Sequence, residues 1–452
     1  MNARLISLLL ILTVCLFGCD TSSKDKPIQP SAGHNDRQVK APPSPAPKPA
    51  TLLVDALDVA LVETATAALP IWRDHAPHKP ALVLFSNQPF LDRIPEVLLN
   101  QAIDLVRNGT STQIDERAVK ISANPLLMHT MAVSAALQAG LFSELIWILP
   151  VKDEGGLPPL ETFRQAMLDR NLVSQAEAES FAETGDHYTA VLRGVPATVG
   201  TLDHIPHPQS PAWVHIDVSF FQPLYVNEVS TPIYPLVLNS LRKMREGGIN
   251  SIGATISQSN LGGALSLKIR FLGNDLSHLL KHPASIDAEL PELQFRRAQN
   301  LYLEQFVKKE EVVENCLKME ALAPNDPSVK FELYNAYREI NKGTLALEAL
   351  AAAVAIDPMY AYEYLYLAET AAEKKRPDAA LNMLEKARQT FSDNPLVRIM
   401  EADINIELGR REAAVNLLSQ LQTLPWSKVY DQDMPGRLED MKKIAEKLPA
   451  SP

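Results

Sequence analysis

The chain has 452 residues, of which 46% are hydrophobic, and this is enough material for two or three domains with cores of their own. Its formal net charge of −11 argues against a nucleic-acid partner, because binding to phosphates requires a basic surface.

The first nineteen residues have the pattern of an export signal. Arg4 provides a positive start, Leu5 to Val14 form an apolar run, and Leu16-Phe17-Gly18-Cys19 follows. A membrane-spanning helix needs about 20 apolar residues, so this run is too short for one and suits a signal segment instead. The segment could be an ordinary cleaved signal, an uncleaved membrane anchor or the signal of a lipid-modified protein.

This segment resembles the signals of bacterial lipoproteins, although Phe17 stands where a smaller residue is usual. The resemblance implies that residues 1–18 are removed and that Cys19 carries a lipid, which anchors the protein at the extracytoplasmic face of the cell envelope. In enterobacterial lipoproteins an aspartate at the position of Asp20 favours the inner membrane. Cys316 is then the one other cysteine of the mature chain, so no internal disulfide is expected.

Residues 19–50 are predicted to be a linker. The proline-rich stretch from Ala41 to Pro49 fits neither a helix nor a sheet interior, because proline lacks the N–H donor. It is expected to be a semi-extended spacer of about 3.1 Å per residue that holds the folded part away from the membrane.

Residues 51–288 are predicted to form an α/β domain, because short apolar runs alternate with helical patterns. The predicted strands are 81–85, 145–150, 188–192, 197–202, 213–221, 251–257 and 265–271, and the predicted helices are 94–106, 125–139 and 232–245. Strands interleaved with helices indicate a mainly parallel sheet with helices on both faces. Ligand sites in such sheets collect at the carboxyl ends of the strands.

Polar residues stand at three of these expected strand ends. They are Ser86-Asn87-Gln88-Pro89, a loop with Asp203, His204 and His207, and the pair His215 and Asp217. His215 and Asp217 share one face of their strand, because side chains alternate along it. They are expected to form either a hydrogen-bonded core pair or half of a metal site, for which Asp203, His204 or His207 is the natural source of a third ligand.

This arrangement resembles, faintly, the arginase and deacetylase-like α/β superfamily. Asn87-Gln88-Pro89-Phe90 and Asp217-Val218-Ser219 stand where that superfamily carries its metal motifs, but most of the ligands are missing. The resemblance implies an inactive descendant, with a metal-dependent envelope hydrolase as the alternative. No cofactor is predicted, because no phosphate-binding loop or nucleophile elbow is found. Ser257-Gln258-Ser259-Asn260, which follows a predicted strand, suits a polar ligand or an ordinary turn.

The last third of the chain has a period of 34 residues. Pro324 and Pro358 are 34 residues apart, and Ala346, Ala380 and Ala414 recur at the same interval. This spacing resembles tetratricopeptide repeats, each of which is a pair of helices that must stack on its neighbours. The repeats are set within 290–428, at 327–360, 361–394 and 395–428, with a diverged one at 293–326. Residues 429–452 are expected to add a capping helix, at 436–448, and a tail.

In that family the first helix of each repeat lines a concave groove. Carrying those positions over predicts that a protein or peptide partner contacts Phe331, Asn335, Arg338, Tyr362, Leu365, Glu369, Leu396, Ile399 and Asp403. The alternative is that the array packs on the α/β domain and the groove is filled internally. The leading interpretation is a lipid-anchored scaffold of the cell envelope whose α/β domain is non-catalytic or binds a small ligand.

Overall fold

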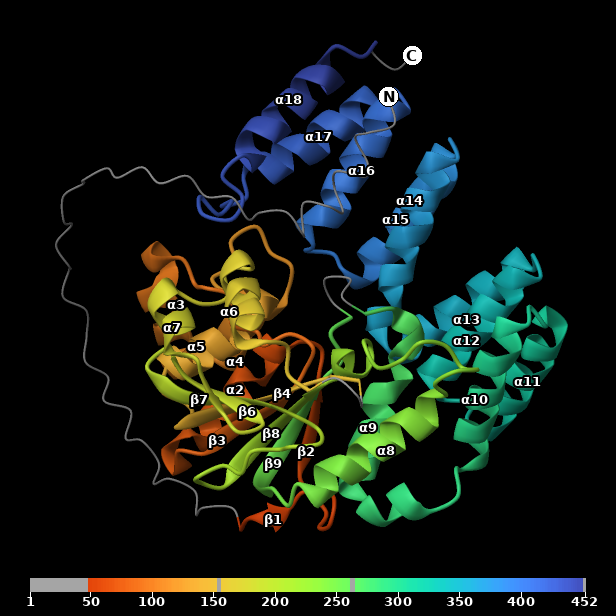
Figure 1. Ribbon diagram of the computed structural model, residues 1–452. Coiled ribbons are helices and arrows are strands. Elements are labelled where there is room, and N and C mark those ends of the chain that lie inside the picture. Colours follow the sequence, from red (N-terminus) through yellow and green to blue (C-terminus); the bar gives the residue numbers. More distant parts are fainter. Residues whose placement is uncertain (1–47, 153–155, 261–264, 450–452) are drawn as a thin grey trace, which may run out of the picture. The chain divides into compact units, whose positions relative to one another are not determined.

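The computed structural model describes residues 48–152, 156–260 and 265–449. The predicted signal, Cys19, Asp20 and most of the linker therefore lie outside the described residues. Lys48 to Pro452 belong to one compact unit, which holds a sheet region followed by a helical array (Figure 1). None of the described helices combines the length and the apolar character needed to cross a membrane.

The sheet region contains one nine-stranded sheet of mostly parallel strands. The strands are β1 (Ala50–Thr51), β2 (Val59–Val62), β3 (Ala81–Phe85), β4 (Glu144–Leu149), β5 (Ala182–Thr184), β6 (His187–Leu192), β7 (Val195–Thr201), β8 (Ala212–Asp217) and β9 (Asn250–Ser257). Their order is β1-β9-β8-β3-β4-β7-β6-β5, and β2 pairs in parallel with β9. The strands from β9 to β7 are parallel neighbours, whereas β1, β6 and β5 pair antiparallel at the edges. The predicted fold class is confirmed.

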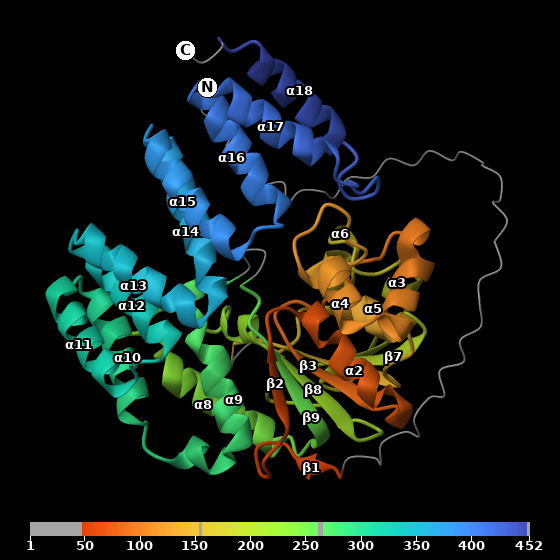
Figure 2. The ribbon, with the colours of Figure 1, turned by 180° about the vertical axis from the view of Figure 1, so that it is seen from behind.

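Helices cover both faces of the sheet, as Figures 1 and 2 show. Leu82 and Leu84 of β3 belong to one core cluster, and Val83 and Phe85 belong to the other, because successive side chains of a strand point to opposite faces. The first cluster is completed by α2 (Leu69–His75), α3 (Glu96–Asn108), α5 (Ala132–Gln138), α6 (Leu160–Asp169) and α7 (Gln175–Ser180). The second is completed by α8 (Ile233–Glu246) and α9 (Phe271–Lys281).

Three predicted elements differ from the structure. The strand predicted at 213–221 ends at Asp217, because its carboxylate accepts the Ser219 N–H and turns the chain into the 3-10 helix η5 (Val218–Phe221). The strand predicted at 265–271 is instead the 3-10 helix η6 (Leu267–Ile269) and the start of α9, with Ser266 capping the turn. The helix predicted at 125–139 is α-helical only in α5, after the short 3-10 helix η4 (His129–Met131).

The helical array consists of four antiparallel helix pairs and a final helix. The pairs are α10 (Glu292–Gln305) with α11 (Lys309–Leu322), α12 (Pro327–Glu339) with α13 (Gly343–Ile356), α14 (Tyr362–Glu373) with α15 (Pro377–Thr390), and α16 (Pro395–Glu407) with α17 (Arg411–Gln422). The final helix is α18 (Met434–Glu446). One helix pair occupies each range predicted for a repeat, and the pair in the diverged range begins one residue earlier, at Glu292.

The 34-residue period has a direct structural cause. Ala346, Ala380 and Ala414 are at most 1% exposed, and a small side chain at this position lets the second helix of each pair approach the first closely. Two of the first helices begin in the same way, because Asp326 and Asn394 accept a backbone N–H just ahead of a proline in the first turn.

Two buried arginines join the array to the sheet region. Arg297 of α10 donates from Nε to Glu332 of α12 (2.5 Å) and lies 4.0 Å from Asp275 of α9. Arg270, at the start of α9, donates from Nε to Asp357 of the array (2.6 Å) and from Nη1 to Glu63 in the loop after β2 (2.8 Å). Both side chains are about 5% exposed or less, so their guanidinium groups are removed from water. Each guanidinium instead pairs with carboxylates from the sheet region and from the array.

Candidate functional site

The first helices of the repeats, α12, α14 and α16, form one surface of the array, which we call the inner surface. Its residues are in register, since Asn335, Glu369 and Asp403 occupy the same position in three successive repeats. The nine residues predicted to contact a partner all come from these helices. The structure divides them into three groups by exposure.

Two of the nine are core residues. Phe331 is 3% exposed and its ring packs against Tyr334 and Tyr360, with centroids 5.3 and 4.7 Å apart. Ile399 is 1% exposed. Arg338 is exposed, and the remaining six are half-buried, as expected for side chains that line a surface: Asn335, Tyr362, Leu365, Glu369, Leu396 and Asp403.

The sheet region covers the first part of the inner surface. Leu267 of η6 packs against the core cluster that contains Phe331 and Tyr360. Arg270 lies over the ring of Tyr360, 5.9 Å from its centroid, while it pairs with Asp357. In this part the structure agrees with the alternative of a groove filled from within the chain. α14 and α16, in contrast, make their extensive contacts with neighbouring array helices.

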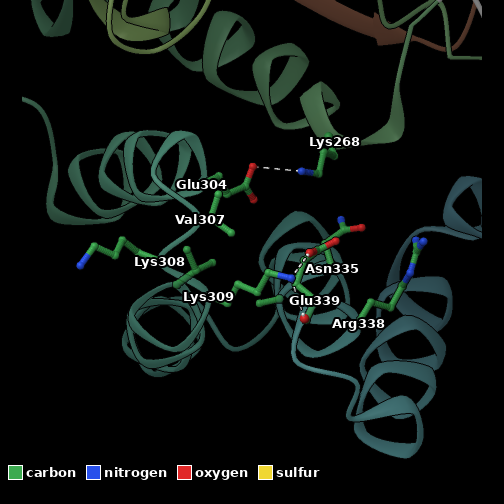
Figure 3. A pocket seen from close by; sticks show the side chains of 10 residues that line it. Lys268, Glu304, Val307, Lys308, Lys309, Asn335, Arg338 and Glu339 are labelled. Atoms are coloured by element: carbon green, nitrogen blue, oxygen red, sulfur yellow. Dashed lines mark hydrogen bonds and ion pairs between the residues drawn. The ribbon is translucent and has the colours of Figure 1, made fainter.

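A pocket of about 370 Å³ lies at the boundary of the covered part (Figure 3). It is lined by Lys268, Glu304, Val307, Lys308, Lys309, Val312, Asn335, Ala336, Arg338 and Glu339. Asn335 and Arg338 are two of the predicted contact residues, whereas the residues from η6, α10 and α11 were not predicted. They come from segments far apart in the sequence, so spacing within one repeat gives no signal for them.

This pocket has more cationic than anionic side chains, and each cation is paired with a carboxylate of the chain. Four cationic side chains line it against two carboxylates. Lys268 pairs with Glu304 (3.0 Å) and Lys309 with Glu339 (3.1 Å), so a ligand carboxylate would compete with these partners. Arg338 donates to Tyr334 Oη (2.9 Å) and Glu363 Oε1 (3.0 Å), which holds its guanidinium between α12 and α14.

His215 and Asp217 form a buried hydrogen-bonded network with the neighbouring strand β9. His215 Nδ1 lies 2.8 Å from Thr255 Oγ1, and its Nε2 lies 3.0 Å from Ser257 Oγ. Ser257 and Ser259 both donate to the Asp217 carboxylate. The two predicted residues thus share one face, with the Ser257 hydroxyl between them.

The donors around Thr255 determine the tautomer of His215. Trp72 and Trp213 both donate from Nε1 to Thr255 Oγ1, at 3.1 Å each. A hydroxyl accepts two hydrogen bonds, so Thr255 must donate its own proton to His215 Nδ1. The proton of His215 therefore sits on Nε2 and is donated to Ser257, whose proton goes to Asp217.

Burial determines the protonation of this network. The absence of solvent lowers the pKa of His215 to about 3, because a charged imidazolium would lose its hydration. Burial raises the pKa of Asp217, and hydrogen bonds from three serines oppose that change. Both side chains are 0% exposed, so the network stabilises the β8–β9 pairing and is closed to solvent.

The structure does not bring His204 to this pair. His204 follows β7, is 59% exposed and lies 3.6 Å from Asp186. Strands β4 and β3 separate β7 from β8, so three strand spacings, or about 14 Å, lie between them. Within the ranges 48–152, 156–260 and 265–449, no three His, Cys, Asp or Glu side chains are arranged to hold a metal ion. The expectation of His204 as a third ligand is therefore corrected.

The other two predicted strand-end segments are used within the chain. Ser86 Oγ accepts the Gln88 N–H (3.0 Å), and its carbonyl accepts from Trp147 Nε1 (2.9 Å). Asn260 donates to the carbonyl of Ser266 (3.2 Å) and accepts from Arg270. The superfamily resemblance stated for Asn87-Gln88-Pro89-Phe90 and Asp217-Val218-Ser219 stays a prediction.

One comparison with known proteins identifies the class of the array. Residues 371–423, from the end of α14 to just beyond α17, match the family model of the tetratricopeptide repeat. Comparisons with curated proteins and with solved structures give no match. The helical array is therefore a tetratricopeptide-like repeat array, a class of structure that generally mediates protein–protein interaction.

Proposed function

We propose that the chain is a lipid-anchored scaffold of the cell envelope that binds a protein partner through its repeat array. The observation that carries this proposal is the inner surface of α14 and α16, where Leu365, Glu369, Leu396 and Asp403 are half-buried side chains on successive first helices. Mixed apolar and charged surfaces on helical repeats accept a peptide or helix from a partner.

The sequence pattern at Cys19 supports the anchor. A diacylated cysteine would place the array on the extracytoplasmic side, and several acyl chains make such anchoring stable, since each buried methylene contributes about 0.8 kcal/mol. Replacing Cys19 by serine should move the chain from the membrane fraction to the soluble fraction. Equal membrane retention of the variant would contradict lipid anchoring.

Site-specific photocrosslinking in intact cells tests the partner. A photoreactive residue at Leu365, on the inner surface, should give a discrete crosslinked protein band. The matched control is Leu345 on α13, which is 43% exposed and belongs to a second helix. No band from position 365, or the same band from position 345, would contradict the proposal.

A further inference from the structure

α14 and α16 present the same stripe of side chains on the inner surface. Tyr366, Glu369 and Glu373 follow one another at helical spacing on α14. Met400, Asp403 and Glu407 occupy the equivalent positions on α16, 34 residues later. The stripe is apolar in the first half of each helix and acidic in the second half. Tyr366 is 53% exposed, with the Arg338 guanidinium 5.9 Å from its ring centroid, and Met400 is half-buried.

Three carboxylates of the stripe, Glu369, Glu373 and Glu407, lack counterions within the part of the chain that the structure describes. Burial raises the pKa of Glu369, and the neighbouring Glu373 carboxylate adds to this; burial and Asp403 raise the pKa of Glu407 in the same way.

Two of these carboxylates also oppose the helix dipole. Glu373 and Glu407 are the last residues of α14 and α16, where the partial negative charge of the helix end disfavours an anion. The equivalent residue of α12, Glu339, is compensated inside the chain by Lys309 at 3.1 Å. Among the described residues no ion pair compensates Glu373 or Glu407 in this way, and positive charges from a partner would do so.

Most of the stripe is not used for packing of the array, although Met400 packs against the core between the repeats. α14 and α16 contribute other residues to the core between the repeats, among them Ala368, Ala372, Val397 and Ile404. The stripe is therefore a helix face that is available to a partner.

We propose that this face binds a basic amphipathic segment of the protein partner. The inference rests on the proposed function and specifies the chemistry of the partner. Apolar side chains of the segment would contact Tyr366, Leu396 and Met400, and its lysines or arginines would reach Glu369, Glu373 and Glu407. Residues seven apart in a helix rise about 10.5 Å, so one basic residue every two turns would place its charges along one side of the segment.

Binding of two synthetic peptides to the full chain, purified in detergent, tests the inference. One is an 18-residue amphipathic helix with leucine on one face and lysine on the other, and its counterpart has glutamate in place of lysine. We expect the lysine peptide to bind at least about 10-fold more tightly by fluorescence anisotropy, and less tightly as salt rises. In the double variant Glu369→Gln/Glu373→Gln its affinity should fall by about 10-fold.

The control variant is Glu348→Gln/Glu412→Gln, which removes two exposed carboxylates from the second helices α13 and α17. It should leave the affinity unchanged. Equal binding of both peptides, no binding of either, or an equal loss in the control would overturn the inference. A partner that crosslinks from position 365 and is not displaced by the lysine peptide would retain the proposed function and refute this inference alone.

Discussion

Arg297 shows how much one buried side chain contributes to the junction between array and sheet region. Its guanidinium is surrounded by Glu332, Asp326 and Asp275, donates to Ser328 Oγ (2.7 Å), and stacks over the ring of Phe271 at 4.6 Å. Removing one partner of a buried ion pair leaves an uncompensated charge, which costs more than the pair itself contributes.

The substitution Arg297→Ala should therefore lower the free energy of unfolding by about 3–5 kcal/mol. Urea denaturation of the full chain measures this value. Arg388→Ala is the control, because Arg388 pairs with Glu385 at the surface and should contribute less than about 1 kcal/mol. Similar values for the two variants would show that the buried cluster is not important for stability.

His215 should make stability depend on pH. Its pKa is about 3 in the folded chain and about 6.5 when unfolded, so the unfolded state takes up the proton first as the pH falls. The free energy of unfolding should therefore decrease between pH 6.5 and pH 3, by about 2 kcal/mol between pH 7 and pH 5 from this residue alone. Asp217 acts in the opposite sense, because its pKa is raised on folding.

The variant His215→Gln isolates this contribution. Its free energy of unfolding should change less between pH 7 and pH 5 than that of the unaltered chain, whereas His204→Gln should leave the change as it is. Identical pH dependence of the unaltered chain and His215→Gln would refute a neutral, buried imidazole.

The sequence predicts part of this network and not the rest. Alternation along a strand places His215 and Asp217 on one face, which the structure confirms. Their partners Thr255 and Ser257 are some 40 residues further on, and only the pairing of β8 with β9 brings them into contact. The alternative of a metal site completed by His204 was wrong because the order of strands is not encoded in spacing.

At the scale of elements, the repeats follow from the sequence because their period reflects a local steric requirement. Small residues recur where helices cross closely, and this can be read without knowing the rest of the fold. The secondary structure of the segment 265–271 could not be predicted in this way. Its apolar residues suggest a strand, yet Leu267 contacts the array and Arg270 binds Asp357, both distant in sequence.

Close packing of the helix pairs predicts that Ala346→Leu lowers the free energy of unfolding by about 1–3 kcal/mol, because the larger side chain pushes α12 and α13 apart. Ala351→Leu is the control on the same helix, since Ala351 is exposed. Thermal and urea unfolding compare the two. Equal effects would show that the position of the periodic alanines is not critical.

At the scale of the whole molecule, the array contacts the sheet region at both of its ends. Near its start Arg270 and Arg297 form the links described above. Near its end Ser427 donates its N–H to the Ala123 carbonyl (2.8 Å), and Tyr430 Oη donates to the Leu126 carbonyl (3.2 Å). The sheet and the array should therefore unfold as one cooperative unit.

Arg270→Ala should uncouple them. Trp72, Trp147 and Trp213 report mainly on the sheet region, while the far-ultraviolet circular dichroism is dominated by helices. The two transitions should coincide in the unaltered chain and separate in Arg270→Ala, with the helical signal lost first. Coinciding transitions in the variant would mean that Arg270 does not couple the two parts.

Hydrogen exchange of the full chain, with and without the bound lysine peptide, tests the central claim most directly. We expect slower amide exchange in 362–373 and 395–407, which form α14 and α16, and unchanged exchange in α13 at 343–356. Protection confined to the sheet region, or no protection anywhere, would contradict a partner-binding role for this part of the array.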